Sequence, residues 1–190
     1  MPRWESNTRE RLEAAALALF TERGFEAATV ADIAERAGLT ERTFFRYFTD
    51  KREVLFAGQE ALRDRMLAAV TETPAGTPPL AIVEQALLAM TPIFDARREV
   101  VHARQRVVHA NAELRERELH KMAMLATLLA EALVTRGVPP TTATLAAETG
   151  MTVFRLAFMR WIETGATTSY AESLRALFAT LTDVVTATGA

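Results

Sequence analysis

The sequence predicts an all-α protein with a three-helix head, which contains a helix–turn–helix, and a C-terminal helical domain. Apolar residues recur three and four positions apart along most of the chain, as they do in amphipathic helices. From Leu80 onward no stretch has the alternating pattern of a strand. Loop-forming residues are concentrated in TETPAGTPP (71–79), which we interpret as a connection between helices.

The composition limits the class of protein. The 190 residues are 49% hydrophobic and 24% charged, with a net charge of −2, which argues against unspecific coating of nucleic acid. Cysteine is absent, which fits a reducing compartment. No apolar run approaches the roughly 18 residues needed to cross a bilayer, and the N-terminus lacks the apolar core of a signal peptide. We therefore expect a cytoplasmic protein without a membrane partner.

The stretch TVADIAERAGLTERTFFRYFTDK (29–51) predicts two short helices joined by a tight turn. Thr29 is a good N-cap for the first helix, and Thr40 for the second. Gly38 ends the first helix, because glycine adopts the left-handed conformation without steric cost. This arrangement is a helix–turn–helix, although an ordinary helical hairpin with a solvated charged face is the alternative.

The second helix of such a motif lies in the major groove of DNA. Arg42 suits bidentate contact with guanine, and Thr43 suits a base edge or a thymine methyl group. Lys51 follows the helix where a phosphate strand would run, so we expect it to contact the backbone. The local excess of cations supports this interpretation despite the negative net charge.

The segment from about residue 9 to 56 also contains a set of residues at a specific spacing: Ala18, Phe20, Gly24, Phe25, Thr29, Val30, Ile33, Ala34, Ala37, Gly38, Leu39, Phe48, Thr49, Asp50 and Lys51. In this set the chain resembles the DNA-binding domain of the TetR family of bacterial transcriptional regulators. This chain has Phe45 where the family has tyrosine, and Tyr47 where histidine is frequent. Which of these two contacts the DNA backbone is left open.

The resemblance implies a DNA-binding domain at residues 1–50 and a ligand-binding and dimerisation domain at 51–190. The resemblance, together with the exposed face of the second helix, predicts which residues contact DNA. These are Thr29, Thr40, Glu41, Arg42, Thr43, Phe45, Arg46, Tyr47 and Lys51. The remaining helices are expected at about 8–23, 50–70, 80–96 with a kink at Pro92, 98–110, 113–136, 142–164 and 169–186. The helix at 50–70 would link the two domains.

The last two predicted helices are apolar on more than one side, so they need cover from several directions. In the family, the last two long helices pair with their copies, which implies a homodimer. The predicted interface residues are Met151, Leu174, Phe178, Leu181 and Val185. An unusually buried monomer core is the alternative.

The middle helices combine flexible apolar side chains with cations, which suits a pocket for a small hydrophobic effector with an acidic or polar end. The predicted pocket residues are Met90, Phe94, His102, Arg106, His109, Met122, Phe154, Arg155 and Phe158. Plain core packing is the alternative for each of the apolar members.

No catalytic constellation is recognisable, so we expect neither an enzyme nor a cofactor. His102, His109 and Glu113 have a spacing that permits a metal site, but surface or half-buried histidines are the preferred interpretation, and no metal is predicted.

Taken together, we expect a sequence-specific transcriptional regulator, a homodimeric repressor released from a double-stranded DNA operator by a small molecule. The alternative is a ligand-independent dimeric DNA-binding protein whose C-terminal domain only dimerises or binds a protein partner.

Overall fold

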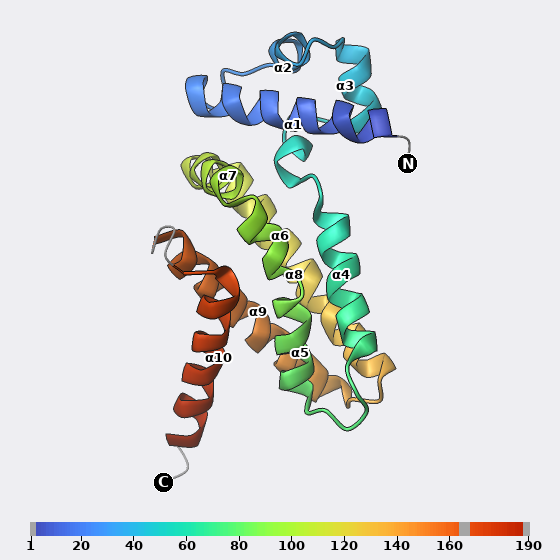
Figure 1. Ribbon diagram of the computed structural model, residues 1–190, viewed down its shortest axis with the longest axis vertical. Coiled ribbons are helices and arrows are strands. Elements are labelled where there is room, and N and C mark those ends of the chain that lie inside the picture. The colour runs from blue at the N-terminus through green and yellow to red at the C-terminus, as the bar shows by residue number, and fades with distance from the viewer. Residues whose placement is uncertain (1–2, 164–167, 188–190) are drawn as a thin grey trace. The chain divides into compact units, whose positions relative to one another are not determined.

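A computed structural model describes residues 3–163 and 168–187 (Figure 1). Within these ranges every regular element is a helix, which confirms the predicted all-α class. The elements are α1 (Arg3–Arg23), α2 (Val30–Arg36), α3 (Glu41–Tyr47), the 3-10 helix η1 (Glu53–Phe56), α4 (Gln59–Glu72), α5 (Pro79–Leu88), α6 (Thr91–Ala96), α7 (Arg98–Ala110), α8 (Ala112–Thr135), α9 (Pro140–Glu163) and α10 (Tyr170–Ala187).

The chain packs as two compact units. The first comprises the chain up to Gln59 together with Glu99–Glu118, and the second comprises Glu60–Arg98 and the chain from Leu119 onward. The first unit therefore includes η1 and most of α7, which the predicted domain of residues 1–50 leaves out. That division by function stays a prediction, whereas the packing groups these later residues with the head.

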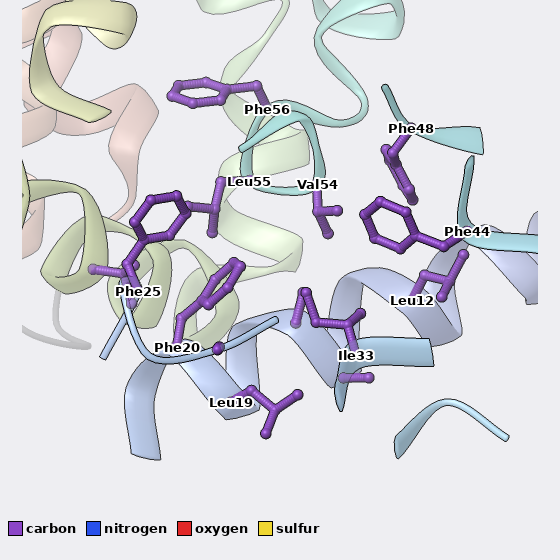
Figure 2. Packing of buried hydrophobic residues seen from close by; sticks show 14 of the residues in the cluster. Leu12, Leu19, Phe20, Phe25, Ile33, Phe44, Phe48, Val54, Leu55 and Phe56 are labelled. Carbon is purple, nitrogen blue, oxygen red and sulfur yellow. The ribbon is translucent and has the colours of Figure 1, made fainter. Parts of the chain in front are cut away.

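The core of the first unit is built where α1, α2 and α3 meet η1. Val54 points toward Phe44, and Leu55 lies beside Phe20 and Phe25 (Figure 2). The rings of Phe20 and Phe25 lie 5.0 Å apart. From α7 and the start of α8, Val107, Val108 and Leu114 join this core. Burial of these side chains holds the short helices α2 and α3, which are too short to be stable alone.

Three predicted helices differ from the structure. The first begins at Arg3, not near Thr8. The predicted helix at 50–70 is divided into η1 and α4, because Gly58 adopts a φ of +79° between them. The predicted kink at Pro92 is a full break, since α5 ends at Leu88 and Pro92 stands in the first turn of α6, where its missing N–H costs nothing.

The second unit is organised around α9, which packs along both α10 and α5. Its buried residues include Ala143, Ala146, Ala147 and Gly150, small side chains that allow neighbouring helices to approach closely. A Cβ atom built on Gly150 would lie 2.1 Å from Cγ1 of Val83 on α5. Glycine is therefore needed at this position for the observed contact between α5 and α9.

One stretch, Pro79–Ala96, is long and apolar enough to cross a membrane by length and composition, with a mean hydropathy of 1.2 over 18 residues. This overturns the expectation that no apolar run approaches that length. The stretch is not one continuous helix, because α5 ends at Leu88 and α6 begins at Thr91. On α5, Ile82, Val83 and Leu87 are buried within the protein.

Candidate functional site

The helix–turn–helix is held in place by side-chain caps at both of its helices. At the start of α2, the backbone N–H of Thr29 donates to Oδ2 of Asp32 at 2.9 Å, and the N–H of Asp32 donates to Oγ1 of Thr29 at 3.1 Å. The Thr29 hydroxyl also donates to Oδ2 of Asp32 at 2.6 Å, and this bond, together with that from the Thr29 backbone N–H, holds the pKa of Asp32 below its ordinary value. At the start of α3, Oγ1 of Thr40 accepts the N–H of Thr43 at 3.2 Å. Both predicted N-caps are confirmed.

The turn between the helices depends on Gly38, whose φ is +64°. The N–H of Leu39 donates to the carbonyl of Ala34 at 2.9 Å, which closes the C-terminal end of α2. A guanidinium nitrogen of Arg11 on α1 donates to the carbonyl of Ala37. It would also lie 3.0 Å from a Cβ atom at Gly38, so the turn is crowded as well as left-handed.

Helix α3 has one buried face and one exposed face. Phe44 is fully buried, and its ring lies 5.4 Å from that of Phe48, the C-cap residue. The side chains turned to solvent are those of Glu41, Arg42, Phe45 and Arg46. The Phe45 side chain is 54% exposed, an unusual position for a large apolar residue. A short rigid helix thus presents two guanidinium groups and one aromatic ring on a single surface.

Tyr47 closes this helix beside Arg46. A guanidinium nitrogen of Arg46 donates to the Tyr47 hydroxyl at 3.0 Å, and the guanidinium carbon stands 5.0 Å from the ring centroid. In this bond the hydroxyl is the acceptor, so its own proton stays available to an acceptor such as a phosphate oxygen.

Lys51 has a different role from the phosphate contact that we expected. Its Nζ donates to the carbonyl oxygens of Phe25, Glu26 and Ala28, at 2.8, 3.1 and 3.0 Å. It also stands 4.5 Å from the centroid of the Phe25 ring. An ammonium group has only three N–H donors, and all three are used in tying down the loop between α1 and α2. A phosphate contact would require one of these bonds to break.

Asp50 organises the chain after α3. Its Oδ1 accepts the backbone N–H groups of Arg52 and Glu53, at 2.7 and 3.1 Å, and its Oδ2 accepts the Arg52 guanidinium at 2.8 Å. Burial alone would raise the pKa of Asp50, but the hydrogen bonds from Arg52 outweigh it and hold the pKa below its ordinary value of 3.8. Arg52 also pairs with Glu113, which joins η1 to the start of α8.

This carboxylate makes the stability of the first unit sensitive to acid. Because the folded-state pKa of Asp50 is depressed, its contribution is complete above the unfolded-state pKa and is lost as the pH falls through the folded-state value. We expect Asp50→Asn to lower the unfolding free energy by up to about 1 kcal/mol at pH 6, and by less as the pH falls below about 4. Urea titrations of both proteins across this range measure the difference. A difference that grows toward low pH would contradict the assignment.

The predicted pocket residues are divided between the two units. Phe94, Phe154 and Phe158 come together, with centroids 5.9 Å apart from Phe94 to each of the other two. Met90 is buried and Met122 half-buried in the same second unit. Of the remaining members, His102, Arg106 and His109 lie on α7 in the first unit, and Arg106, His109 and Arg155 are exposed.

Two aromatic residues that sequence reasoning did not assign to a pocket complete this cluster. Trp161 and Tyr170 are fully buried, and their rings stack at 5.4 Å. The Tyr170 hydroxyl donates to the carbonyl of Phe154 at 2.9 Å, and burial raises its pKa well above the ordinary value. Phe94 and Phe158 stay partly exposed, so the cluster is open on one side.

The cation at this cluster is Arg98, which the sequence did not single out. Its guanidinium carbon stands 4.6 Å from the Trp161 ring centroid, and one terminal nitrogen donates to the carbonyl of Thr168. The other terminal nitrogen is buried and has no hydrogen-bond partner in the described part of the chain. No ion pair joins Arg98 to a carboxylate among residues 3–163 and 168–187.

Some of the predicted interface residues are buried within one chain, and others lie at its surface. Met151, Leu174 and Phe178 are buried inside the second unit of a single chain, and their place in an interface stays a prediction. Val185 is 65% exposed. Leu181 lines an open, mainly apolar groove of about 390 Å³ between α9 and α10. Its other lining residues are Glu148, Thr149, Thr152, Val153, Leu156, Leu177, Thr180 and Val184.

A second hollow, of about 350 Å³, lies beside Arg136 and the loop at Gly76. The Arg136 guanidinium donates to the carbonyls of Val70, Thr71, Thr73 and Pro74, at 2.9, 3.1, 2.7 and 3.2 Å. It thereby caps the C-terminal end of α4, where a cation is favoured by the helix dipole. This is a structural role, and no predicted pocket residue lines the hollow.

The described residues contain no group of three or more His, Cys, Asp or Glu side chains placed to hold a metal ion. The alternative of a site at His102, His109 and Glu113 is therefore not formed in this part of the chain.

Comparison with known proteins agrees with the geometry of the head. Residues 12–57 match the family described as bacterial regulatory proteins, tetR family. Over 83 residues the chain is 41% identical to the HTH-type transcriptional regulator TcmR of Streptomyces glaucescens. The aligned part makes up 44% of this chain and 37% of that relative. The chain thus matches well under half the length of this curated relative.

Solved structures extend the likeness of fold to most of the chain. A TetR-family regulator from Syntrophomonas wolfei matches with a TM-score of 0.66 and 17% identity, over 92% of this chain and 93% of that one. The Thermus thermophilus repressor FadR, in complex with lauroyl-CoA, matches with a TM-score of 0.57 and 23% identity, over 90% and 91%. The helix–turn–helix and these similarities agree: residues 12–57 match the tetR family, and the fold of most of the chain is similar to that of solved regulators of this family.

Proposed function

We propose that this protein is a sequence-specific DNA-binding regulator that acts as a homodimer and represses transcription until a small molecule releases it from its operator. The observation that carries the proposal is the exposed face of α3, where Arg42, Phe45 and Arg46 stand on a helix fixed by a buried Phe44. A rigid helix with two exposed guanidinium groups suits both base edges and phosphates in a major groove.

Retention of DNA fragments from the source genome tests the proposal directly. The purified full-length chain is mixed with sheared genomic DNA at physiological salt, and the bound fragments are sequenced. We expect a few fragments to be enriched, sharing an inverted repeat whose half-sites lie about one helical turn apart. Uniform recovery of all fragments would contradict sequence-specific binding.

Within this function we assign base reading to Arg42. Its side chain is exposed in the first turn of α3, and no ion pair joins it to a carboxylate in the described part of the chain. We expect Arg42→Ala to weaken operator binding by about 1–3 kcal/mol and to relax the preference at one base pair of each half-site. Fluorescence anisotropy with the enriched operator and its single-base variants measures both effects. An equal loss on all sequences would assign Arg42 to phosphate instead.

Support for the homodimer comes from the groove between α9 and α10. Along α9, Leu145 and Leu156 are 63% and 47% exposed, and Val184 on α10 is 60% exposed. Apolar side chains of this number on adjacent helices are usually covered by a partner. A second copy that presents the same face would pair two α9 and two α10 helices around a local two-fold axis. Dimerisation then sets the spacing of the two copies of α3 on DNA.

Support for a ligand-responsive domain comes from the aromatic cluster and Arg98. The Thermus thermophilus relative of similar fold is a repressor in complex with lauroyl-CoA, an apolar chain on an anionic carrier. In this chain, Arg98 offers a buried donor that has no acceptor among the described residues, next to an aromatic surface that is partly open. We therefore propose Arg98, in place of Arg106 and Arg155, as the group that pairs with the acidic end of the effector.

Matched probes test this ligand class: 2-naphthoate and lauroyl-CoA as anions, and 2-naphthylmethylammonium as a cation. We expect an anion to raise the melting temperature by mass action and to release DNA in the same concentration range. Arg98→Gln should abolish both effects, because the amide retains hydrogen bonding but not charge. Arg155→Gln, at an exposed position on α9, is the control and should respond as the wild type does.

The alternative function is a dimeric DNA-binding protein that needs no ligand. The observation in its favour is that neither hollow described above is lined by the aromatic cluster. DNA binding that stays unchanged with all three probes, and with an extract of the source cell's metabolites, would favour this alternative.

A further inference from the structure

We propose that Phe45 recognises the C5-methyl group of a pyrimidine in the major groove. The inference rests on the proposed function, DNA binding through α3, and adds which chemical group the helix reads beside Arg42. It also separates Phe45 from the contacts to the sugar–phosphate backbone.

The placement of Phe45 follows from the helix itself. Phe44 is fully buried, and the next residue is rotated by about 100° around the axis, so Phe45 leaves the core and stays 54% exposed. Arg42 lies three residues earlier on the same face. The rings of Phe44 and Phe45 meet edge to face, with centroids 5.5 Å apart and an angle of 84° between planes. The exposed ring is therefore in contact with the buried one.

The chemistry of the ring excludes the usual backbone contacts. A phenyl ring has no N–H or O–H to donate to a phosphate oxygen, and the neighbouring Tyr47 hydroxyl, with its own proton free, is the better phosphate donor. Base pairs present mainly hydrogen-bonding groups in the major groove, and the C5-methyl of thymine is the one methyl group among them. An exposed phenyl ring on a major-groove helix gains most by covering that methyl group.

Recognition of the methyl group can be distinguished from recognition of the whole base. 5-Methylcytosine carries the same methyl group at the same place in the groove, although its other groove atoms differ from those of thymine. The ring should therefore distinguish thymine from uracil and 5-methylcytosine from cytosine, and by similar factors. Binding at this position would then respond to cytosine methylation.

The test uses the full-length chain and synthetic duplexes. A random duplex library is first enriched on the wild-type protein, and each thymine of the resulting site is then replaced singly by deoxyuridine, which removes only the methyl group. We expect one thymine in each half-site whose replacement weakens binding about fourfold, the effect of uncovering one methyl-sized group. At the same position, 5-methylcytosine should bind about fourfold better than cytosine.

Two variants assign the effect to Phe45. Phe45→Ala should bind the thymine and deoxyuridine duplexes equally, whereas Phe45→Tyr, which keeps the ring, should retain the difference. Because the side chain is exposed, both variants are expected to fold, and circular dichroism checks this.

The possible failures are distinguishable. Specific binding with no sensitivity to any deoxyuridine, or sensitivity that persists in Phe45→Ala, overturns the assignment of Phe45 and leaves the proposed function intact. Failure to enrich any sequence overturns the proposed function and this inference together.

Discussion

Lys51→Met is expected to destabilise the first unit by about 2–3 kcal/mol, while leaving the salt dependence of DNA binding unchanged. Methionine keeps the apolar stem but removes three N–H donors, which leaves the carbonyls of Phe25, Glu26 and Ala28 without this partner. Equilibrium unfolding in urea measures the first effect. The second is the slope of log K against log salt concentration, measured where the variant is still folded.

The control for this experiment is Lys121→Met, because Lys121 is the other lysine of the chain and lies on α8 in the second unit. It should leave the unfolding of the first unit unchanged. If instead Lys51→Met keeps full stability and lowers the salt slope by about one unit per subunit, Lys51 is a phosphate contact. In that case its three hydrogen bonds in the free protein would be exchanged for one to DNA.

The second large effect is expected at α10, where one substitution should unfold the second unit and a neighbouring one should prevent dimerisation. Phe178→Asp places a charge inside the second unit, where Phe178 is buried, and should unfold that unit at a cost of several kcal/mol. Leu181→Asp places the same charge in the open groove, so the chain should stay helical but become monomeric. We expect operator binding to be lost in both.

Circular dichroism and analytical ultracentrifugation separate these outcomes. Leu156→Asp, on the α9 side of the groove, should behave as Leu181→Asp does, since both residues line the same surface. A folded Leu181→Asp variant that still sediments as a dimer would show that the groove is not the interface. If the Phe178→Asp variant is folded and monomeric, Phe178 belongs to the dimer interface and not to the core of the second unit.

The head was predictable because its signals are local. An N-cap, a left-handed glycine and a pair of inward phenylalanines each act within one or two turns, so Thr29, Gly38 and Phe44 were placed correctly. The helix at 50–70 was predicted wrongly because Gly58 is a single weak signal within an otherwise helical pattern. Helical periodicity indicates that a residue is buried, but not which neighbour buries it.

The other roles could not be predicted because they depend on residues distant in sequence. Lys51 acts on carbonyls 23 to 26 positions earlier, and Arg98 lies 70 positions from Thr168. In the sequence both are ordinary cations among other charges. The same limit applies to Phe178 and Leu181, which share a helix and an apolar character. Only the packing of α10 on α9 shows that one faces inward and the other lines the groove.

The close approach of α5 and α9 has a consequence for how this sequence can vary. The space that a methyl group would need at Gly150 is already filled by Cγ1 of Val83. The two positions therefore share a single volume, and an enlargement at one is acceptable only with a reduction at the other. Alanine in place of Val83 removes Cγ1 and so makes room for the methyl group of an alanine at position 150, although the pair then has one side-chain carbon fewer than before. In evolution, these two residues are expected to change as a pair.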